Sequence, residues 1–264
     1  LILAALDEGV EKIIVGIGGS ATNDGGAGML QALGALLLDA NKQPIGAGGG
    51  CLQDLAAIDL SGLDKRLADV EIVVACDVDN PLCGEKGASA VFGPQKGATA
   101  EMVQALDSGL QHFAALAARD LGLDIQSPAG AGAAGGMGGG VLLLPDARLQ
   151  AGVKIVMEAV GLAEKVQDAD LVITGEGRMD AQSVHGKTPI GVAHTAKAFG
   201  KPVIAIVGCL REDYEVVYAQ GIDAVFPIIR QLGSLEEILQ HGRDNLVSAA
   251  QNVARIYQMG ISRK

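Results

Sequence analysis

Segments of strand and helix character alternate over the last third of the chain, and this alternation constrains the fold more than any other feature. Asp170–Thr174, Pro202–Gly208 and Ala224–Phe226 are apolar runs of strand length, whereas Ile190–Phe199 and Leu235–Tyr257 have the composition of helices. Strands that are each followed by a helix predict a parallel sheet wound by helices on both faces. In such sheets the functional site lies at the carboxyl ends of the strands.

The first two thirds of the chain carry the same two kinds of segment. Lys12–Ile17 and Val70–Cys76 are expected to be buried strands. We expect helices over Met29–Leu38, Thr99–Leu121 and Arg148–Val160, with apolar residues at helical spacing most regular in Thr99–Leu121. The predicted fold class is therefore α/β.

Composition agrees with this class and points to unusual backbone packing. Apolar residues make up 49 % of the chain but aromatic residues only 3 %, so the core must consist of Ala, Val, Ile and Leu. The 38 glycines gather in Gly16–Gly28, Gly46–Gly50 and Gly130–Gly140. We expect loops there, at which the backbone approaches another group closely.

The net charge, the length of the apolar runs and the cysteine pattern argue against a nucleic-acid partner, a membrane span and secretion. The formal net charge of −11 disfavours a nucleic-acid partner, because binding to a polyanion requires a basic stripe. No apolar run reaches the roughly 20 residues of a membrane span. The four cysteines form no CxxC pair, and nothing resembles a secretory signal. A soluble, cytoplasmic protein with reduced thiols is expected.

The first candidate site is the loop Gly16–Gly28, which directly follows the strand Lys12–Ile17. Its small residues leave backbone amides free to converge on an anion, and its side chains add hydroxyl, amide and carboxylate groups. The candidates for binding substrate or nucleotide are Gly18, Gly19, Ser20, Thr22 and Asn23, with Asp24 as a cation ligand. The alternative is a structural turn.

The same loop also fits a loose dinucleotide pattern. Gly16, Gly18 and Ala21 satisfy G-x-G-x-x-A, with Asp39 downstream as the acid that would bind ribose. A true fingerprint enters its helix at once, whereas this loop continues through Thr22 and beyond. The nicotinamide interpretation is therefore weak, but it stays open.

A second candidate site follows the strand Val70–Cys76. Asp77 is a carboxylate at a strand end, which suits Mg²⁺ together with water and phosphate oxygens. A turn-capping role for Asp77 explains the residue equally well. Nearby Gln95 and Lys96 offer groups for an anion.

The third candidate site is the segment after the strand Asp170–Thr174, where polar residues are densest. It contains Arg178, Asp180, His185 and Lys187 as candidate catalytic residues, and Gly175, Glu176 and Ser183 as candidates for binding substrate or nucleotide. A P-loop would require glycine at the position of Ala181, so the Walker interpretation fails, although Lys187 can still meet a phosphate as a point charge. For His185, a hydrogen-bonded loop histidine and a catalytic base explain the sequence equally well.

Four blocks in order closely resemble the glycerate kinase family of the bacterial glycerate 2-kinase type. They read GIGGSATNDGGAGMLQALGA, CDVDNPLCGEKGASAVFGPQKGA, GAGAAGGMGGG and DLVITGEGRMDAQSVHGKTPIGVA. The resemblance covers essentially the whole chain. It implies phosphorylation of D-glycerate by ATP with Mg²⁺, giving 2-phosphoglycerate, with 3-phosphoglycerate as the alternative product.

The resemblance also implies two α/β domains. One is a mixed α/β domain, expected over residues 1–162, and the other is a Rossmann-like, doubly wound domain, of which residues 163–264 form the C-terminal part. The apolar start Leu1–Gly9 lacks an N-cap residue, and we expect the family's N-terminal segment to be missing before it. A non-catalytic remnant and a homo-oligomer both stay open.

By resemblance, the first and third candidate sites are expected to face each other across an interdomain cleft, with the transferring phosphate between them. The expected roles are Mg²⁺ contact for Asp24, Asp77 and Glu176, charge neutralisation for Lys96, Arg178 and Lys187, and acceptance of the hydroxyl proton for Asp180 or His185.

Overall fold

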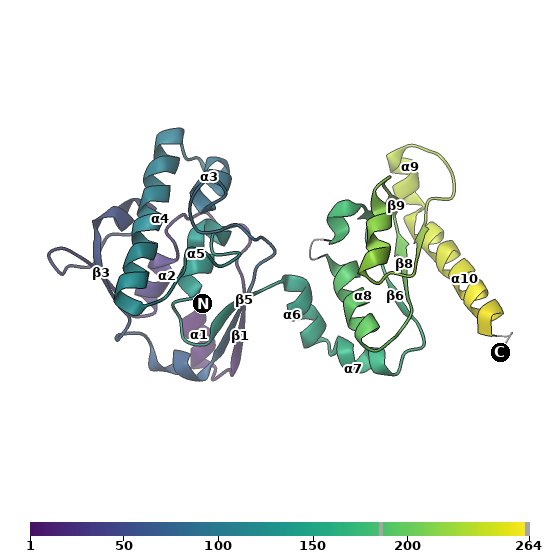
Figure 1. The fold of residues 1–264 in the computed structure, drawn as a ribbon, viewed down its shortest axis with the longest axis horizontal. Coiled ribbons are helices and arrows are strands. Elements are labelled where there is room, and N and C mark those ends of the chain that lie inside the picture. Colours follow the sequence, from purple (N-terminus) through teal and green to yellow (C-terminus); the bar gives the residue numbers. More distant parts are fainter. Residues whose placement is uncertain (185–186, 262–264) are drawn as a thin grey trace. The chain divides into compact units, whose positions relative to one another are not determined.

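The computed structural model describes residues 1–184 and 187–261, and they divide into two compact units (Figure 1). The first unit ends at Gly152 and the second begins at Val153. The expected boundary lay between residues 162 and 163. The chain instead leaves the first unit where strand β5 (Ala147–Gln150) gives way to helix α6 (Gly152–Ala159).

Three parallel strands form the centre of the first unit. Strand β4 (Glu71–Ala75) lies between β1 (Lys12–Gly16) and β5, with Gly16 opposite Ala75 and Ala75 opposite Gln150. The middle strand is buried through Ile72, Val73 and Val74, as expected for a strand covered on both faces. Because β1 and β4 run in the same direction, their carboxyl ends bring the first two candidate sites to one edge of the sheet.

The expectation of a helix over Met29–Leu38 is only half right. Helix α2 (Ala27–Ala32) is short, and β2 (Leu36–Asp39) follows, pairing in antiparallel fashion with β3 (Leu55–Asp59). Gly34 lies between them at φ +102°, where a Cβ would approach the Gly62 carbonyl oxygen to 2.2 Å. Pairing of Leu36–Leu38 with β3 therefore outweighs their local helix preference.

The long amphipathic helix is confirmed as α4 (Ala100–Leu121). Thr99 caps its start by accepting the Met102 N–H, and Gly122 ends it in the left-handed conformation. Leu110 and Phe113 are completely buried on its inner face. Each such side chain contributes about 1.5–3 kcal/mol through removal of apolar surface from water.

The glycine run that we expected to be a loop forms helix α5 (Ala133–Val141). Its first turn passes through left-handed residues, among them Gly135 at φ +71°. A Cβ on Gly135 would lie 2.0 Å from the Thr22 carbonyl oxygen, and the Gly25 N–H donates to the Gly135 carbonyl at 3.0 Å. The glycines thus allow α5 to pack backbone against backbone on the Gly16–Gly28 loop.

Short elements complete the first unit. They are α1 (Ile2–Asp7), α3 (Ala88–Phe92), and the 3₁₀ turns η1 (Gly49–Asp54), η2 (Lys65–Asp69) and η3 (Pro94–Lys96).

The second unit confirms the parallel sheet. Strand β8 (Val203–Val207) lies between β10 (Ala224–Pro227) and β6 (Val172–Thr174), all parallel. Helices α8 (Thr188–Ala198) and α10 (Gly242–Ile261) lie on opposite sides of these strands (Figure 1). The chain is thus an α/β protein, as expected.

Two expected helices of the C-terminal half have different bounds. Arg148–Val160 is split into strand β5 and helix α6, because Arg148 to Gln150 pair with β4. Leu235–Tyr257 is split at His241 into α9 (Leu235–Gln240) and α10. The remaining elements are α7 (Leu162–Gln167), β7 (Arg178–Met179), η4 (Ala181–Val184), β9 (Cys209–Leu210) and η5 (Tyr214–Gln220). No helix within the described ranges combines the length and apolarity needed to cross a bilayer.

Candidate active site

A cavity of about 440 Å³ opens at the carboxyl ends of β1 and β4 in the first unit. Groups from both predicted sites of this unit line it: Gly16, Ile17, Gly18, Gly19, Ser20, Ala75, Cys76, Asp77, Val78, Phe92, Gln95, Lys96, Ala133 and Ala134. The structure therefore brings together the glycine loop, the acidic strand end and the Gln95–Lys96 pair. Thr22 and Asn23 line a neighbouring cavity of about 360 Å³, which Lys96 also borders.

Lys96 is the cation of this cavity, and its ammonium group has neutral partners. Its Nζ donates to Ser20 Oγ at 2.8 Å and to the Thr22 carbonyl oxygen at 2.7 Å. Burial lowers the pKa of Lys96, and the nearby Asp24 carboxylate partly opposes this effect. Lys96 forms no ion pair with a carboxylate of the described residues. A bound anion would supply that charge partner.

Asp24 makes the contacts of a helix cap. Its two carboxylate oxygens accept the N–H groups of Gly26 and Gly28, each at 3.0 Å, at the start of α2, and only 6 % of the residue is exposed. A role for Asp24 in metal binding stays a prediction.

Asn23 has a partner that the sequence did not reveal. Its Nδ2 donates to the Oγ of Ser89 at 2.9 Å, and Ser89 is completely buried at the start of α3. The Oδ1 atom of Asn23 is buried and has no hydrogen-bond partner. Ser89 stands in the unremarkable run Ala88–Phe92, so no sequence signal could have linked it to Asn23.

Asp77 makes a capping contact, and its role toward Mg²⁺ stays a prediction. One carboxylate oxygen accepts the Gly152 N–H at 2.8 Å, at the start of α6, while the residue is exposed beside the cavity. Across the described ranges, no group of three or more His, Cys, Asp or Glu side chains could hold a metal ion. A single carboxylate still fits Mg²⁺ that arrives on a nucleotide, because phosphate oxygens and water then complete its ligands.

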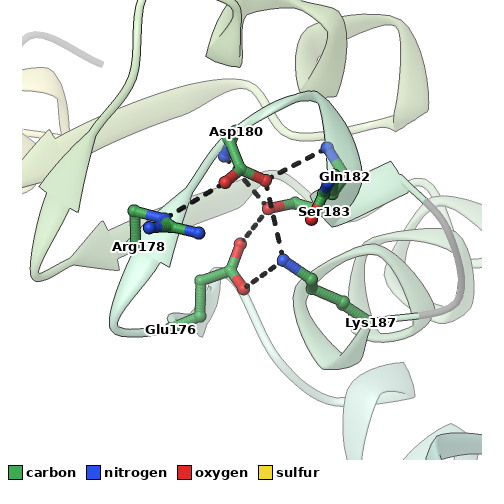
Figure 2. Close-up of polar contacts among 6 residues, drawn as sticks. All are labelled: Glu176, Arg178, Asp180, Gln182, Ser183 and Lys187. Carbon is green, nitrogen blue, oxygen red and sulfur yellow. Dashed lines mark hydrogen bonds and ion pairs between the residues drawn. The ribbon is translucent and has the colours of Figure 1, made fainter.

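The third predicted site forms a compact ionic cluster in the second unit (Figure 2). Arg178 Nε donates to Asp180 Oδ2 at 3.2 Å. Lys187 Nζ lies 3.6 Å from Asp180 Oδ1 and 3.8 Å from Glu176 Oε2. Ser183 joins the backbone of Asp180 to the carboxylate of Glu176, because its Oγ accepts the Asp180 N–H and donates to Glu176 Oε1. Lys187 thus lies between two acidic side chains, and Arg178 is paired with Asp180.

The pKa of Asp180 reflects this environment. Burial on its own would raise the pKa, but the Lys187 ammonium, the Gln182 N–H and the Arg178 guanidinium together hold it below its usual value. The carboxylate side chain is only 4 % exposed. Asp180 therefore stays ionised and orients both cations; its assignment as the base stays a prediction.

Local backbone structure fixes this cluster after β6. Strands β7 and β9 pair in parallel and hold Arg178 opposite Cys209. Gly175 packs against β8, because a Cβ there would lie 2.2 Å from the Ile206 carbonyl oxygen. Lys187 is the N-cap residue of α8. His185, the other candidate base, lies outside the described residues, and the expected interdomain arrangement of the two sites stays a prediction.

The local geometry does not favour the nicotinamide interpretation. Helix α2 begins only at Ala27, so no helix starts directly after the Gly16–Ala21 pattern. The side chain of Asp39, the expected ribose ligand, accepts the N–H groups of Asn41 and Gln43 in its own turn. Neither the glycine pattern nor Asp39 therefore has the local structure of a dinucleotide site.

Comparison with known proteins gives one consistent result. A family model described as the glycerate kinase family matches residues 1–258. A glycerate kinase of Haemophilus influenzae is 66 % identical over 256 residues, which are 97 % of this chain and 68 % of the relative. A glycerate 2-kinase of Escherichia coli is 53 % identical over 261 residues, 99 % of this chain and 68 % of the relative.

A solved structure agrees with these relatives. A crystal structure from Salmonella typhimurium LT2, assigned as glycerate kinase 2, superposes with a TM-score of 0.82 at 54 % identity. The match covers 99 % of this chain and 68 % of that one. The chain thus spans about two thirds of the length of the proteins it matches.

Proposed function

The chain belongs to the glycerate kinase family, and we propose that it transfers a phosphoryl group from MgATP to D-glycerate with 2-phosphoglycerate as the product. Family membership makes it a kinase. The 53 % identity to a glycerate 2-kinase supports the 2-phosphate, while 3-phosphoglycerate is the alternative product. The four cysteines are free thiols, which supports a reducing cytoplasm as its compartment.

The observation that carries the proposal is the pair of cationic sites after parallel strands. Phosphoryl transfer requires mainly positioning of the reactants and neutralisation of phosphate charge. Lys96 and the amides of Gly18 and Gly19 provide one anion site, and Arg178 with Lys187 provides the other. We assign the phosphates and the glycerate carboxylate to these two sites.

Each remaining group has a role that its contacts support. Asp180 orients Arg178 and Lys187, and Glu176 holds Lys187 from the other side. Mg²⁺, when bound, neutralises charge on the phosphates, and Asp77 is the described carboxylate best placed to hold it beside Lys96. Asp180 and His185 remain the candidates for accepting the hydroxyl proton.

A coupled assay of ADP release with D-glycerate and MgATP tests the proposal, with the H. influenzae relative as the positive control. Enolase added without a mutase converts only 2-phosphoglycerate, so it distinguishes the two products. Absence of ADP release under conditions where the relative turns over would refute the proposal for this chain. Thermal stabilisation by NAD(H) instead of MgATP would favour an oxidoreductase, and stabilisation by neither would indicate a non-catalytic protein.

The two candidate bases are tested by substitution. Asp180→Ala or His185→Ala should lower kcat by about 10²–10⁴-fold if the residue accepts the proton. Near-normal turnover in both variants would exclude both as the base.

A further inference from the structure

Ser183 lies at the centre of the ionic cluster but has no exposed surface (Figure 2). It belongs to the 3₁₀ turn η4, between Asp180 and Lys187. Sequence analysis placed it among the residues that bind substrate or nucleotide. Its hydroxyl is fully buried, and both of its hydrogen bonds lie within the cluster, which favours an indirect role.

We propose that Ser183 is a positioning residue, which fixes the Glu176 carboxylate for the phosphoryl transfer proposed above and does not itself touch substrate. This inference rests on the proposed function. A serine hydroxyl has one proton to donate, and that proton is given to Glu176 Oε1. The oxygen accepts the Asp180 N–H at 3.1 Å, so the hydroxyl both donates and accepts within the cluster.

The hydrogen bond from Ser183 to Glu176 leaves the second carboxylate oxygen free to contact Lys187. With Oε1 fixed by Ser183, Oε2 lies 3.8 Å from Lys187 Nζ. The Glu176 side chain is 15 % exposed and that of Lys187 is 38 % exposed, so this is the side of the cluster that a ligand can approach. Ser183 thereby joins the backbone of Asp180 to the carboxylate of Glu176, and both acids hold Lys187 in place.

Removal of the hydroxyl should therefore impair catalysis through Glu176. Ser183→Ala is expected to lower kcat by up to about 10²-fold, the size of effect that follows when a reacting group is displaced by about 1 Å. KM should change much less. Ser183→Thr keeps the hydroxyl and should recover most of the activity. Ser183→Cys, which adds no branch but offers only the weak S–H donor, is the second variant if the threonine methyl disturbs the buried site, and it should recover part of the activity.

A double-mutant cycle separates positioning from a general structural role. If Ser183 acts through Glu176, Ser183→Ala combined with Glu176→Ala should be no slower than Glu176→Ala alone. Ser127→Ala removes an exposed hydroxyl in the turn after Asp124 and should leave kcat unchanged. The proposal would be overturned if the fold-loss in kcat of the double variant equalled the product of the two single losses. It would also be overturned if the kcat of Ser183→Ala lay within about twofold of the parent.

A readout that needs no turnover keeps the proposal independent of the kinase assay. Lys187 can be labelled with acetic anhydride and quantified by mass spectrometry in the parent, Ser183→Ala and Glu176→Gln. We expect faster labelling of Lys187 in both variants, because its contact with Glu176 is loosened in each. Unchanged labelling in Ser183→Ala would overturn the positioning role. If the variants show the expected faster labelling but the chain has no kinase activity, the proposed function is refuted and the positioning role is not.

Discussion

Replacement of Asp24 by alanine is expected to destabilise the first unit by about 2–4 kcal/mol. The substitution leaves the N–H groups of Gly26 and Gly28 without their acceptors at the start of α2. A buried donor without a partner costs about 1–3 kcal/mol, and loss of a helix cap about 0.5–2 kcal/mol. Asp24→Asn keeps one acceptor oxygen, so about half of the loss is expected.

Urea unfolding followed by circular dichroism, in EDTA and again in Mg²⁺, measures this loss. With a slope of about 1–3 kcal/mol/M, the midpoint should fall by about 1–2 M in both conditions. Asp39→Ala is the matched control, because Asp39 also accepts two N–H groups but in an exposed turn, so its effect should be much smaller. An Asp24→Ala midpoint that equals the parent's in EDTA and falls only in Mg²⁺ would show that metal binding, and not capping, is the role of this carboxylate.

Three further predictions follow from contacts described above. Gly135→Ala should lower the free energy of unfolding by clearly more than the about 1–2 kcal/mol that a left-handed alanine costs. Gly122→Ala is the control, because no atom lies within 4 Å of a Cβ there, and it should lower the free energy of unfolding by only that amount. Equal losses of the two variants in thermal unfolding would refute the backbone-packing argument. Because folding lowers the pKa of Asp180, its carboxylate stabilises the folded state above about pH 4, and this contribution is lost as pH falls through the pKa of the folded state. The urea midpoints of the parent and Asp180→Asn should therefore differ at neutral pH and become equal in acid. Lys96→Met should weaken ATP binding in calorimetry by about tenfold or more, and Lys86→Met, at an exposed position, should not.

Long regular patterns were the part of the fold that sequence predicted well. Thr99–Leu121 carries its helical spacing over many turns, and its cap residues stand at both ends. Leu36–Leu38 was assigned wrongly because its local composition suits a helix, whereas its structure depends on β3, which lies later in the chain. The same reason applies to Arg148–Gln150, which pairs with β4.

The candidate sites show the same limit. The cluster from Glu176 to Lys187 could be found because its members are close in sequence and follow a strand. The partners Ser89 for Asn23 and Gly152 for Asp77 are 66 and 75 residues away, and neither has a distinctive neighbourhood. Sequence reasoning could also not tell that Ser183 faces inward, because burial is a property of the assembled cluster.

The backbone contact between α5 and the glycine loop has a consequence for how this enzyme can be re-engineered. Gly25 and Gly140 meet with no side chain between them, since a Cβ on Gly140 would lie 2.2 Å from the Gly25 carbonyl oxygen. The packing of α5 against the loop that lines the anion site therefore depends on main-chain contact, and a side chain at Gly140 would separate the two. A library that aims at new acceptor acids should hold these glycines constant and vary side chains that line the cavity, at Val78, Phe92 and Gln95.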